Sequence, residues 1–439
     1  MRRPVNRMNS ACRHRSWNRS SLSAARSRCC ALGAAWAVLV LSGCGASPAQ
    51  FSLNLVHLHA KDGGSVDNAT TDPELDPAER KNIANAIDAL FGTPDAPRLP
   101  QAAEGFLELS KIQRAAGPTG RDHPQGGERG LYRKHCVHCH GINGDGAGPT
   151  AAFLNPYPRD YRMGLFKFKS TAGPKDKPTH DDLKRILFNG IPGTAMPSFK
   201  VLDDGELEAL VHYVKYLAMR GQTERELVAS ALLADNGLFL DPQKPDSQAF
   251  RDNMSELLEK LGGIAKTWTD AQSSEVPSPP ADWEGTVSIE RGRKLFMTKG
   301  LCHQCHGVSA LGDANRDLFD SWTEDFMLTT GIKNYLKIRN GNATAAEVNL
   351  LDEFYARGAL PVRPLTPRNL RRGVYRGGRR PVDLFRRVRN GIHPMPNAQN
   401  NEKGLLNDEV WHVVAYVRSL PFESITEPTE EIRFQRDLP

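Results

Sequence analysis

Long hydrophobic runs are missing from this chain of 439 residues. No apolar segment reaches the roughly 18 residues that a membrane-spanning helix needs, so a polytopic membrane protein is excluded. Hydrophobic residues still make up 39% of the chain and charged residues 25%, which excludes a wholly disordered protein. The length is sufficient for two or three domains of ordinary size.

Acidic residues and lysine are missing from residues 1–44, which contain eight arginines. The formal net charge of the whole chain is +6, and removing these eight positive charges leaves −2. The excess of positive charge therefore belongs to the N-terminal segment and not to the rest of the protein. Bulk attraction to phosphate does not drive its function, and nucleic acid is not an expected partner.

The arginine-rich segment has the layout of an export signal. An apolar stretch at 31–43 follows the arginines and is too short to span a bilayer. It ends in Leu41-Ser42-Gly43-Cys44, which resembles the lipobox of bacterial lipoproteins, whose cysteine becomes the diacylated N-terminus. The resemblance implies a signal peptide, lipid on Cys44 and attachment to the periplasmic side of a bacterial membrane. Gly45 stands where inner-membrane lipoproteins often carry Asp, which favours the outer membrane. The alternative is an ordinary signal peptide with an incidental cysteine, or an uncleaved anchor.

Cysteine is scarce as well, with eight in the chain. Those at positions 12, 29 and 30 belong to the signal, and Cys44 belongs to the lipobox. The remaining four form two pairs, each followed by histidine: Cys136-Val137-His138-Cys139-His140 and Cys302-His303-Gln304-Cys305-His306. Both segments are C-x-x-C-H, the attachment signature of c-type haem.

The chemistry of haem attachment explains this spacing. Two thiols separated by two residues reach the two vinyl groups of one porphyrin, and the adjacent histidine is delivered to the iron. The predicted ligands are Cys136, Cys139 and His140 for one haem c and Cys302, Cys305 and His306 for a second. Zinc would need both pairs in one four-ligand site, although 163 residues separate them. A thioredoxin-like pair needs no histidine, and disulfides are a further alternative in an oxidising compartment.

An internal repeat includes both motifs. Three segments follow each motif and match in the same order: 158–164 with 367–373, 182–191 with 383–392, and 206–214 with 409–417. Each half has Glu-Arg-Gly before its motif and an amphipathic helical pattern at its end. Two similar domains are therefore predicted.

With these segments, each half resembles the class I cytochromes c, and the whole resembles the bacterial dihaem cytochromes c. The resemblance implies an all-α fold in which the first and last helices of each domain cross beside the haem. It also implies a distal methionine ligand on the loop before the last helix, here Met196 and Met395. A place in the hydrophobic core is the alternative for Met196.

These features divide the chain into six parts. They are a signal peptide (1–44), an extended N-terminal tether with one short helix at 76–91 (45–119), a first cytochrome c domain (120–222), a helical and Pro-rich linker (223–283), a second cytochrome c domain (284–424) and a C-terminal tail (425–439).

The second half departs from the family pattern at its distal loop. The loop at 391–395 is two residues shorter than the loop at 190–196, and His393 lies beside Met395 as an alternative iron ligand. An insertion of 43 residues lies between the second motif and the segment 367–373, and its Met327 is an outside candidate.

The two halves also differ after the haem motif. The resemblance implies that the carbonyl group of Pro149, in Gly148-Pro149, orients His140 through its Nδ1–H. The second half has no Gly-Pro at this point, so the sequence does not name the group that orients His306.

Nine arginines and one acidic residue, Asp383, lie between Arg368 and Arg389. One interpretation is that these arginines are solvated, with some pairing with haem propionates. The other is a docking patch for an acidic redox partner, because complementary charge steers transient encounters.

Two classes of function are compatible with these features. The leading one is a membrane-tethered electron carrier, or an electron-transfer subunit of a respiratory complex, which is not an enzyme. The alternative is a dihaem oxidoreductase, such as a peroxidase, with an open iron position at the second haem.

Overall fold

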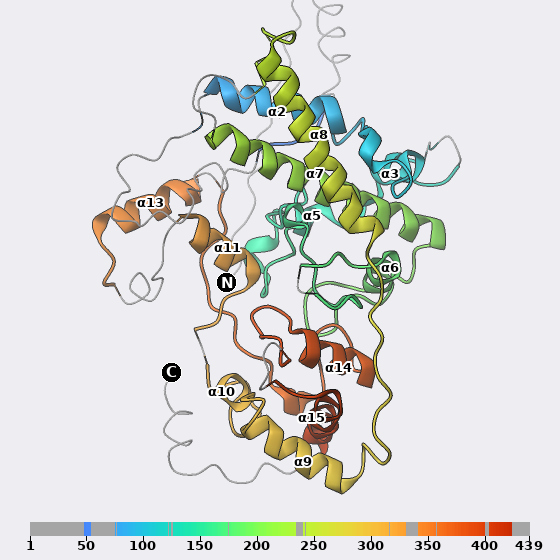
Figure 1. Cartoon of the computed structure of the whole chain (residues 1–439), viewed down its shortest axis with the longest axis vertical. Coiled ribbons are helices and arrows are strands. Elements are labelled where there is room, and N and C mark those ends of the chain that lie inside the picture. The colour runs from blue at the N-terminus through green and yellow to red at the C-terminus, as the bar shows by residue number, and fades with distance from the viewer. Residues whose placement is uncertain are drawn as a thin grey trace, which may run out of the picture. The chain divides into compact units, whose positions relative to one another are not determined.

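The computed structural model describes residues 48–53, 75, 77–121, 123, 126–173, 175–233, 240–241, 243–315, 317–330, 341–356, 358–399 and 404–423. Within these ranges the regular elements are helices with isolated β-bridges, in agreement with the predicted all-α fold (Figure 1). None of the described helices is long and apolar enough to cross a membrane. The predicted lipidation site, Cys44, and the tail at 425–439 lie outside the described residues.

All of the elements below belong to one compact unit, residues 49–439. In chain order the described α-helices are α2 (Pro77–Phe91), α3 (Leu109–Ala115), α4 (Leu131–His135), α5 (Val137–His140), α6 (His180–Asn189), α7 (Asp204–Leu233), α8 (Gln248–Thr269), α9 (Thr286–Met297), α10 (His303–His306), α11 (Ser321–Thr330), α13 (Ala345–Ala356), α14 (Pro381–Asn390) and α15 (Asn407–Ser419). Short 3₁₀ turns are η3 (Gln101–Ala103), η4 (Ala151–Phe153), η5 (Tyr161–Met163), η6 (Leu370–Arg372) and η7 (Leu420–Phe422).

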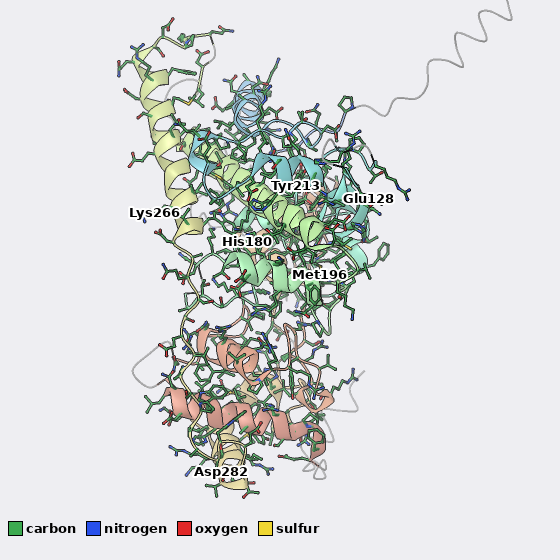
Figure 2. All side chains as sticks on the ribbon, turned by 90° about the vertical axis from the view of Figure 1, so that its right-hand side faces the viewer. Glu128, His180, Met196, Tyr213, Lys266 and Asp282 are labelled. Carbon is green, nitrogen blue, oxygen red and sulfur yellow. The ribbon has the colours of Figure 1, made fainter. Side chains whose placement is uncertain are left out.

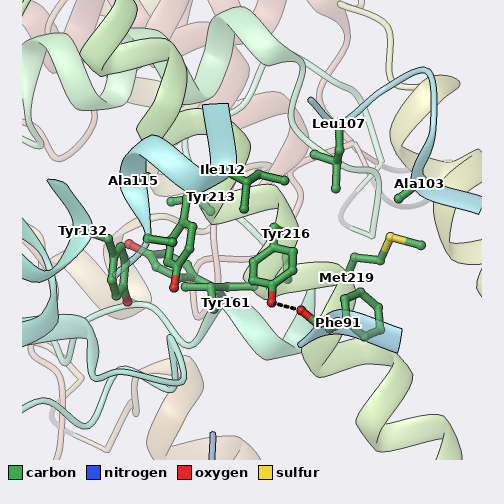
Figure 3. Packing of buried hydrophobic residues seen from close by; sticks show 14 of the residues in the cluster. Phe91, Ala103, Leu107, Ile112, Ala115, Tyr132, Tyr161, Tyr213, Tyr216 and Met219 are labelled. Atoms are coloured by element: carbon green, nitrogen blue, oxygen red, sulfur yellow. Dashed lines mark hydrogen bonds between the residues drawn. The ribbon is translucent and has the colours of Figure 1, made fainter. Parts of the chain in front are cut away.

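The first hydrophobic core forms around α7. Its apolar residues recur every three or four positions, at Leu207, Leu210, Val214 and Leu217, and are buried. Helices α2, α3, α6 and α8 pack against α7. The Tyr216 hydroxyl donates to the carbonyl oxygen of Phe91 at 2.6 Å, which joins α7 to the end of α2 (Figure 3).

The structure differs from the predicted tether at 45–119. The short helix is present as α2, but η3 and α3 follow it, and all three pack into the first core. Ile87, Phe91 and Ile112 are fully buried. Because burial of such side chains stabilises the fold, α2, η3 and α3 are part of the folded body.

The helical part of the predicted linker also belongs to the first core. Helix α8 buries Leu257, Leu261 and Trp268 against it. Only residues 270–283 run as an extended strap toward the second core. There the Trp411 indole N–H donates to the carbonyl oxygen of Pro277 at 3.0 Å.

The second hydrophobic core forms where α9 crosses α15. Gly292 lies at this crossing, and a Cβ there would be 1.9 Å from the carbonyl oxygen of His412. A larger residue would therefore force the two helices apart. In the first half, the matching Gly130 instead precedes the five-residue helix α4 in a left-handed conformation, with φ of +71°. The helix before the motif is thus five residues long in the first half and 12 residues long in the second.

The insertion forms a small cluster of its own. Helices α11 and α13 bury Phe326, Leu351 and Phe354 against one another, and Met327 packs beside them. The rings of Trp322 and Phe326 stack with centroids 5.4 Å apart. The insertion is therefore a folded subdomain over the described part of its length.

Equivalent residues of the repeat face one another where the two halves meet. Gly377 and Phe168 each lie four residues after the matched segments, and a Cβ on Gly377 would overlap the Phe168 ring. Arg386 corresponds to Arg185, and the two charges are close enough to interact. Contacts between equivalents are typical of a local two-fold axis, so the halves pack face to face.

Candidate functional site

Each C-x-x-C-H motif forms a single helical turn. In the first half the His140 N–H donates to the carbonyl oxygen of Cys136 at 2.9 Å, and in the second the His306 N–H donates to Cys302 at 2.9 Å. This turn presents both thiols and the histidine from one short segment. None of the four described cysteines forms a disulfide, and burial raises the pKa of Cys136 to about 12 and of Cys302 to about 11.

A backbone carbonyl orients each motif histidine. His140 Nδ1 lies 3.1 Å from the carbonyl oxygen of Arg159, and His306 Nδ1 lies 3.1 Å from that of Arg368. Because a carbonyl only accepts, Nδ1 carries the proton and Nε2 keeps a free lone pair. Burial lowers the pKa of His140 to about 4 and also lowers that of His306, so both rings are neutral at pH 7. A neutral imidazole with a free Nε2 is the form that binds iron.

These contacts correct the expectation for Pro149. The group that orients His140 belongs to Arg159, in the repeated segment 158–164, and its equivalent Arg368 does the same in the second half. Gly148 has a different role. A Cβ there would lie 2.5 Å from the carbonyl oxygen of His138, so only glycine fits at this position. It lets the chain pass close to the haem-motif turn.

One cavity of about 1060 Å³ joins the two motifs. All eight predicted haem ligands line it: Cys136, Cys139, His140, Met196, Cys302, Cys305, His306 and Met395. Most of the other lining side chains are apolar, among them Leu183, Val214 and Leu384. Met196, on the first core, is labelled in Figure 2. Met327 is not among the lining residues.

The two distal loops close in the same way although their lengths differ. The Ile191 N–H donates to the carbonyl oxygen of Met196 at 3.1 Å, and the Ile392 N–H donates to that of Met395 at 2.9 Å. Gly391 precedes the shorter loop with φ of +73°, and a Cβ on it would lie 2.6 Å from Asn397 N. The two-residue deletion therefore leaves the methionine in an equivalent place on the cavity wall.

Comparison with known proteins agrees with the geometry of the first half. Residues 129–218 match the family model of cytochrome c.

These residues form a cytochrome c domain.

Two further proteins are similar to the chain. The quinohemoprotein alcohol dehydrogenase ADH-IIG of Pseudomonas putida is 42% identical over 77 residues, which are 17% of this chain and 10% of the dehydrogenase. The chain thus spans about a tenth of that relative. A chain of the reducing HAO-like protein complex of Kuenenia stuttgartiensis matches with a TM-score of 0.42 and 20% identity, over 66% of this chain and 94% of that one.

The residues of the cytochrome c domain fit a covalently bound haem c. Paired thiols lie on one turn, the neutral His140 keeps a free Nε2, and Met196 lines the same largely apolar cavity. The second motif offers the same donor set, and its histidine is oriented by the equivalent carbonyl group. Cytochrome c chemistry requires this set of donors.

His393, the alternative distal ligand of the second half, is bound by the insertion. Ser321 Oγ lies 3.2 Å from its Nδ1, and a carboxylate oxygen of Glu324 contacts its Nε2. Both partners belong to α11, so both ring nitrogens are engaged away from the motif histidine. Sequence reasoning missed this contact, because nothing in the pattern brings position 321 near position 393.

The insertion also contacts the cytochrome c domain through Tyr157. The Tyr157 N–H donates to Asp320 at 3.0 Å, and its hydroxyl donates to the carbonyl oxygen of Pro361 at 2.6 Å. The Arg363 guanidinium lies 3.6 Å from the centroid of the Tyr157 ring. The insertion therefore connects the first half to the distal loop of the second.

Most arginines of the segment 368–389 bind this chain's own backbone. Arg371 donates to the carbonyl oxygens of Ser309 and Glu423, and Arg389 donates to that of Glu275. Arg372, Arg379 and Arg380 are exposed, and Arg380 pairs with Asp383 at 2.9 Å. Most of these arginines therefore stabilise the fold, and few of them offer positive charge to a partner.

A cluster of His180, Glu208 and His212 on the cytochrome c domain has the residue types of a metal site. However, Lys184 pairs with Glu208 at 2.9 Å, and Lys215 lies 3.2 Å from His180 Nδ1. His212 Nδ1 accepts the backbone N–H of Glu108, which leaves its Nε2 protonated. The cluster is therefore an ion-pair network that joins α3, α6 and α7.

Proposed function

We propose that this chain is a dihaem c-type cytochrome that transfers single electrons between redox partners. One observation carries the proposal: two C-x-x-C-H turns, each with a carbonyl-oriented histidine and a methionine loop, line one continuous cavity. Haem c supplies a one-electron Fe(III)/Fe(II) couple when it is bound. We propose that the second core, with its own motif, is a second cytochrome c domain joined to the first through the strap at 270–283.

The chain's own residues hold both irons in this proposal. Cys136 and Cys139 would attach the first haem, and His140 and Met196 would bind its iron. In the second half, Cys302 and Cys305 would attach the haem, and His306 and Met395 would bind its iron. A thioether ligand favours Fe(II), so both centres have higher potentials than bis-histidine haems. The cavity walls around both sites are largely apolar.

The enzymatic alternative requires an open or exchangeable position on the second iron. Met395 lines the cavity there, and its loop closes by the same hydrogen bond as that of Met196. This arrangement supports two six-coordinate irons and therefore a carrier. Binding of carbon monoxide by the reduced wild-type protein would favour the oxidoreductase instead.

We further propose that the protein is lipid-anchored through Cys44 on the periplasmic side of a bacterial membrane, with the outer membrane favoured by Gly45. The tetrapeptide 41–44 supports this placement. Cys44→Ser should release the processed protein from membranes into the soluble periplasmic fraction. Continued attachment of a processed variant would contradict the lipoprotein proposal.

The proposed partners are redox proteins of the same compartment. The exposed Arg372 and Arg379 offer a small positive surface for an acidic partner. Weaker reduction by such a partner at higher salt would support this contact.

The haem count tests the central proposal. A pyridine haemochrome assay should give two covalent haems per chain, and denaturation in acid should not release them. His140→Ala should impair only the first site. One haem per wild-type chain would refute the dihaem proposal.

A further inference from the structure

Four cationic side chains line the cavity where the two halves meet. Arg159 and Lys167 come from the first half, and Arg368 and Arg376 are their equivalents, 209 residues later. We propose that these four side chains bind the propionate carboxylates of the two haems, and that each half supplies cations to the haem of the other half. This inference rests on the proposed function because it requires both haems.

The cavity wall carries a large excess of positive charge. Among its described lining residues are seven arginines and lysines but only two carboxylates, those of Asp160 and Asp320. Asp160 is already paired with Arg162 at 2.9 Å. Burying like charges together is costly unless anions accompany them. Two haems carry four propionates, which would offset most of this excess.

Two of the arginines have unused donors. The Nε atoms of Arg368 and Arg376 are buried and have no hydrogen-bond partner among the described residues. Burial lowers the pKa of both groups. Asp320 is close to Arg376, but its oxygens already accept the backbone N–H groups of Tyr157 and Thr323. A planar carboxylate matches the donor geometry that these guanidinium groups leave open.

Arg368 links the two haem sites directly. Its carbonyl oxygen accepts from His306 Nδ1 in its own half, at 3.1 Å. Its guanidinium crosses to the other half and donates from Nη2 to the carbonyl oxygen of Gly193, three residues before Met196. The side chain therefore lies at the distal loop of the first haem while its backbone orients the proximal ligand of the second.

Arg159 shows the reverse arrangement. Its carbonyl oxygen orients His140 in the first half. Its side chain and that of Lys167 line the cavity together with Ile392 and Met395 of the second half. The first half thus places two cations beside the distal loop of the second haem. A local two-fold relation between the halves predicts this arrangement, in which each half supplies cations to the haem site of the other.

Removal of a cation from this site should lower the reduction potential of the haem that it serves. A positive charge beside a propionate disfavours Fe(III), and the effect is large where water is excluded. For Arg368→Gln and Arg376→Gln we expect about a tenfold change in the Fe(II)/Fe(III) ratio at fixed potential. For a one-electron couple this corresponds to about 59 mV.

The experiment is a spectroelectrochemical titration of the full-length dihaem protein. Arg379→Gln is the matched control, because it removes the same charge from an exposed position of the same segment that does not line the cavity. Arg368→Lys should retain most of the potential, because it keeps the charge. In the Met196→His variant the first haem should titrate at a lower potential, because imidazole lacks the thioether's preference for Fe(II), and this shift identifies the wave of that haem.

Shifts in potential test the propionate site, whereas the haem count tests the dihaem function. Arg368→Gln should shift the wave of the first haem, whose distal loop its side chain contacts. A shift confined to the second haem would overturn the exchange of cations between halves. Shifts no larger than that of Arg379→Gln, in a protein that binds two haems, would overturn the propionate site. One haem per wild-type chain would refute the dihaem function itself.

Discussion

Replacement of Met395 by alanine should change the second haem alone. The variant removes a thioether from the cavity wall, so the second iron loses its distal ligand and becomes open to carbon monoxide. The weak sulfur-to-iron absorption at the red end of the spectrum should keep only the contribution of the first haem. Met395 is partly buried, so we expect a loss in the free energy of unfolding of about 1–2 kcal/mol, below that of a fully buried methionine.

Two matched variants give this experiment its controls. His393→Ala removes the contacts of His393 with Ser321 and Glu324, and the side chains of His393 and Glu324 are 39% and 48% exposed. Pairs this exposed contribute about 1 kcal/mol or less, so the variant should fold, keep both sulfur bands and exclude carbon monoxide. Met327→Ala lies in the insertion cluster and should leave both haem spectra unchanged.

The opposite results for Met395→Ala and His393→Ala would contradict the assignment of Met395 as the distal ligand. An unchanged spectrum for Met395→Ala would show that this methionine is not the ligand. Loss of distal ligation in His393→Ala would assign that position to imidazole and would favour the enzymatic alternative. Visible absorption of the reduced protein with and without carbon monoxide decides between these cases.

Three further variants test the packing and the pH dependence. Gly292→Ala should destabilise the second core by about 1–3 kcal/mol in denaturant unfolding, because its Cβ would meet α15; Gly262→Ala, with open space around it, should be neutral or stabilising. Ile87→Ala should cost about 2–5 kcal/mol by the same assay; an unchanged midpoint would mean that α2 is not part of the first core. Burial lowers the pKa of His212 from 6.5 to about 4, so folding disfavours its protonated form. The contribution of neutral His212 to the free energy of unfolding should be present above pH 6.5 and lost as the pH falls toward 4. In His212→Gln the free energy of unfolding should change less between these two pH values.

Local sequence patterns predicted the parts of the site that lie on short segments. The C-x-x-C-H motifs determine their own turn geometry, and the Asn-Gly before each distal loop places Met196 and Met395 on the cavity wall. The internal repeat aligns Arg159 with Arg368 but does not predict a role for either residue. Their shared role depends on the position of a backbone carbonyl, which no side-chain pattern records.

Long-range packing could not be predicted in this way. Residues 77–119 were predicted to be part of a tether because the burial of α2 and α3 depends on α7, which begins only at Asp204. The binding of His393 by Ser321 and Glu324 depends on how the insertion folds back over the second half. Such contacts arise from tertiary structure and leave no periodicity in the sequence.

The continuity of the cavity has a consequence for how the protein matures. Both C-x-x-C-H turns open onto the space between the halves, so closing the halves covers the thiols that would react with the vinyl groups in the proposed dihaem protein. On that proposal we expect covalent attachment to precede docking of the halves. The strap at 270–283 joins the two cores along the chain, and the contacts of Tyr157 with Asp320 and Pro361 join the first half to the insertion.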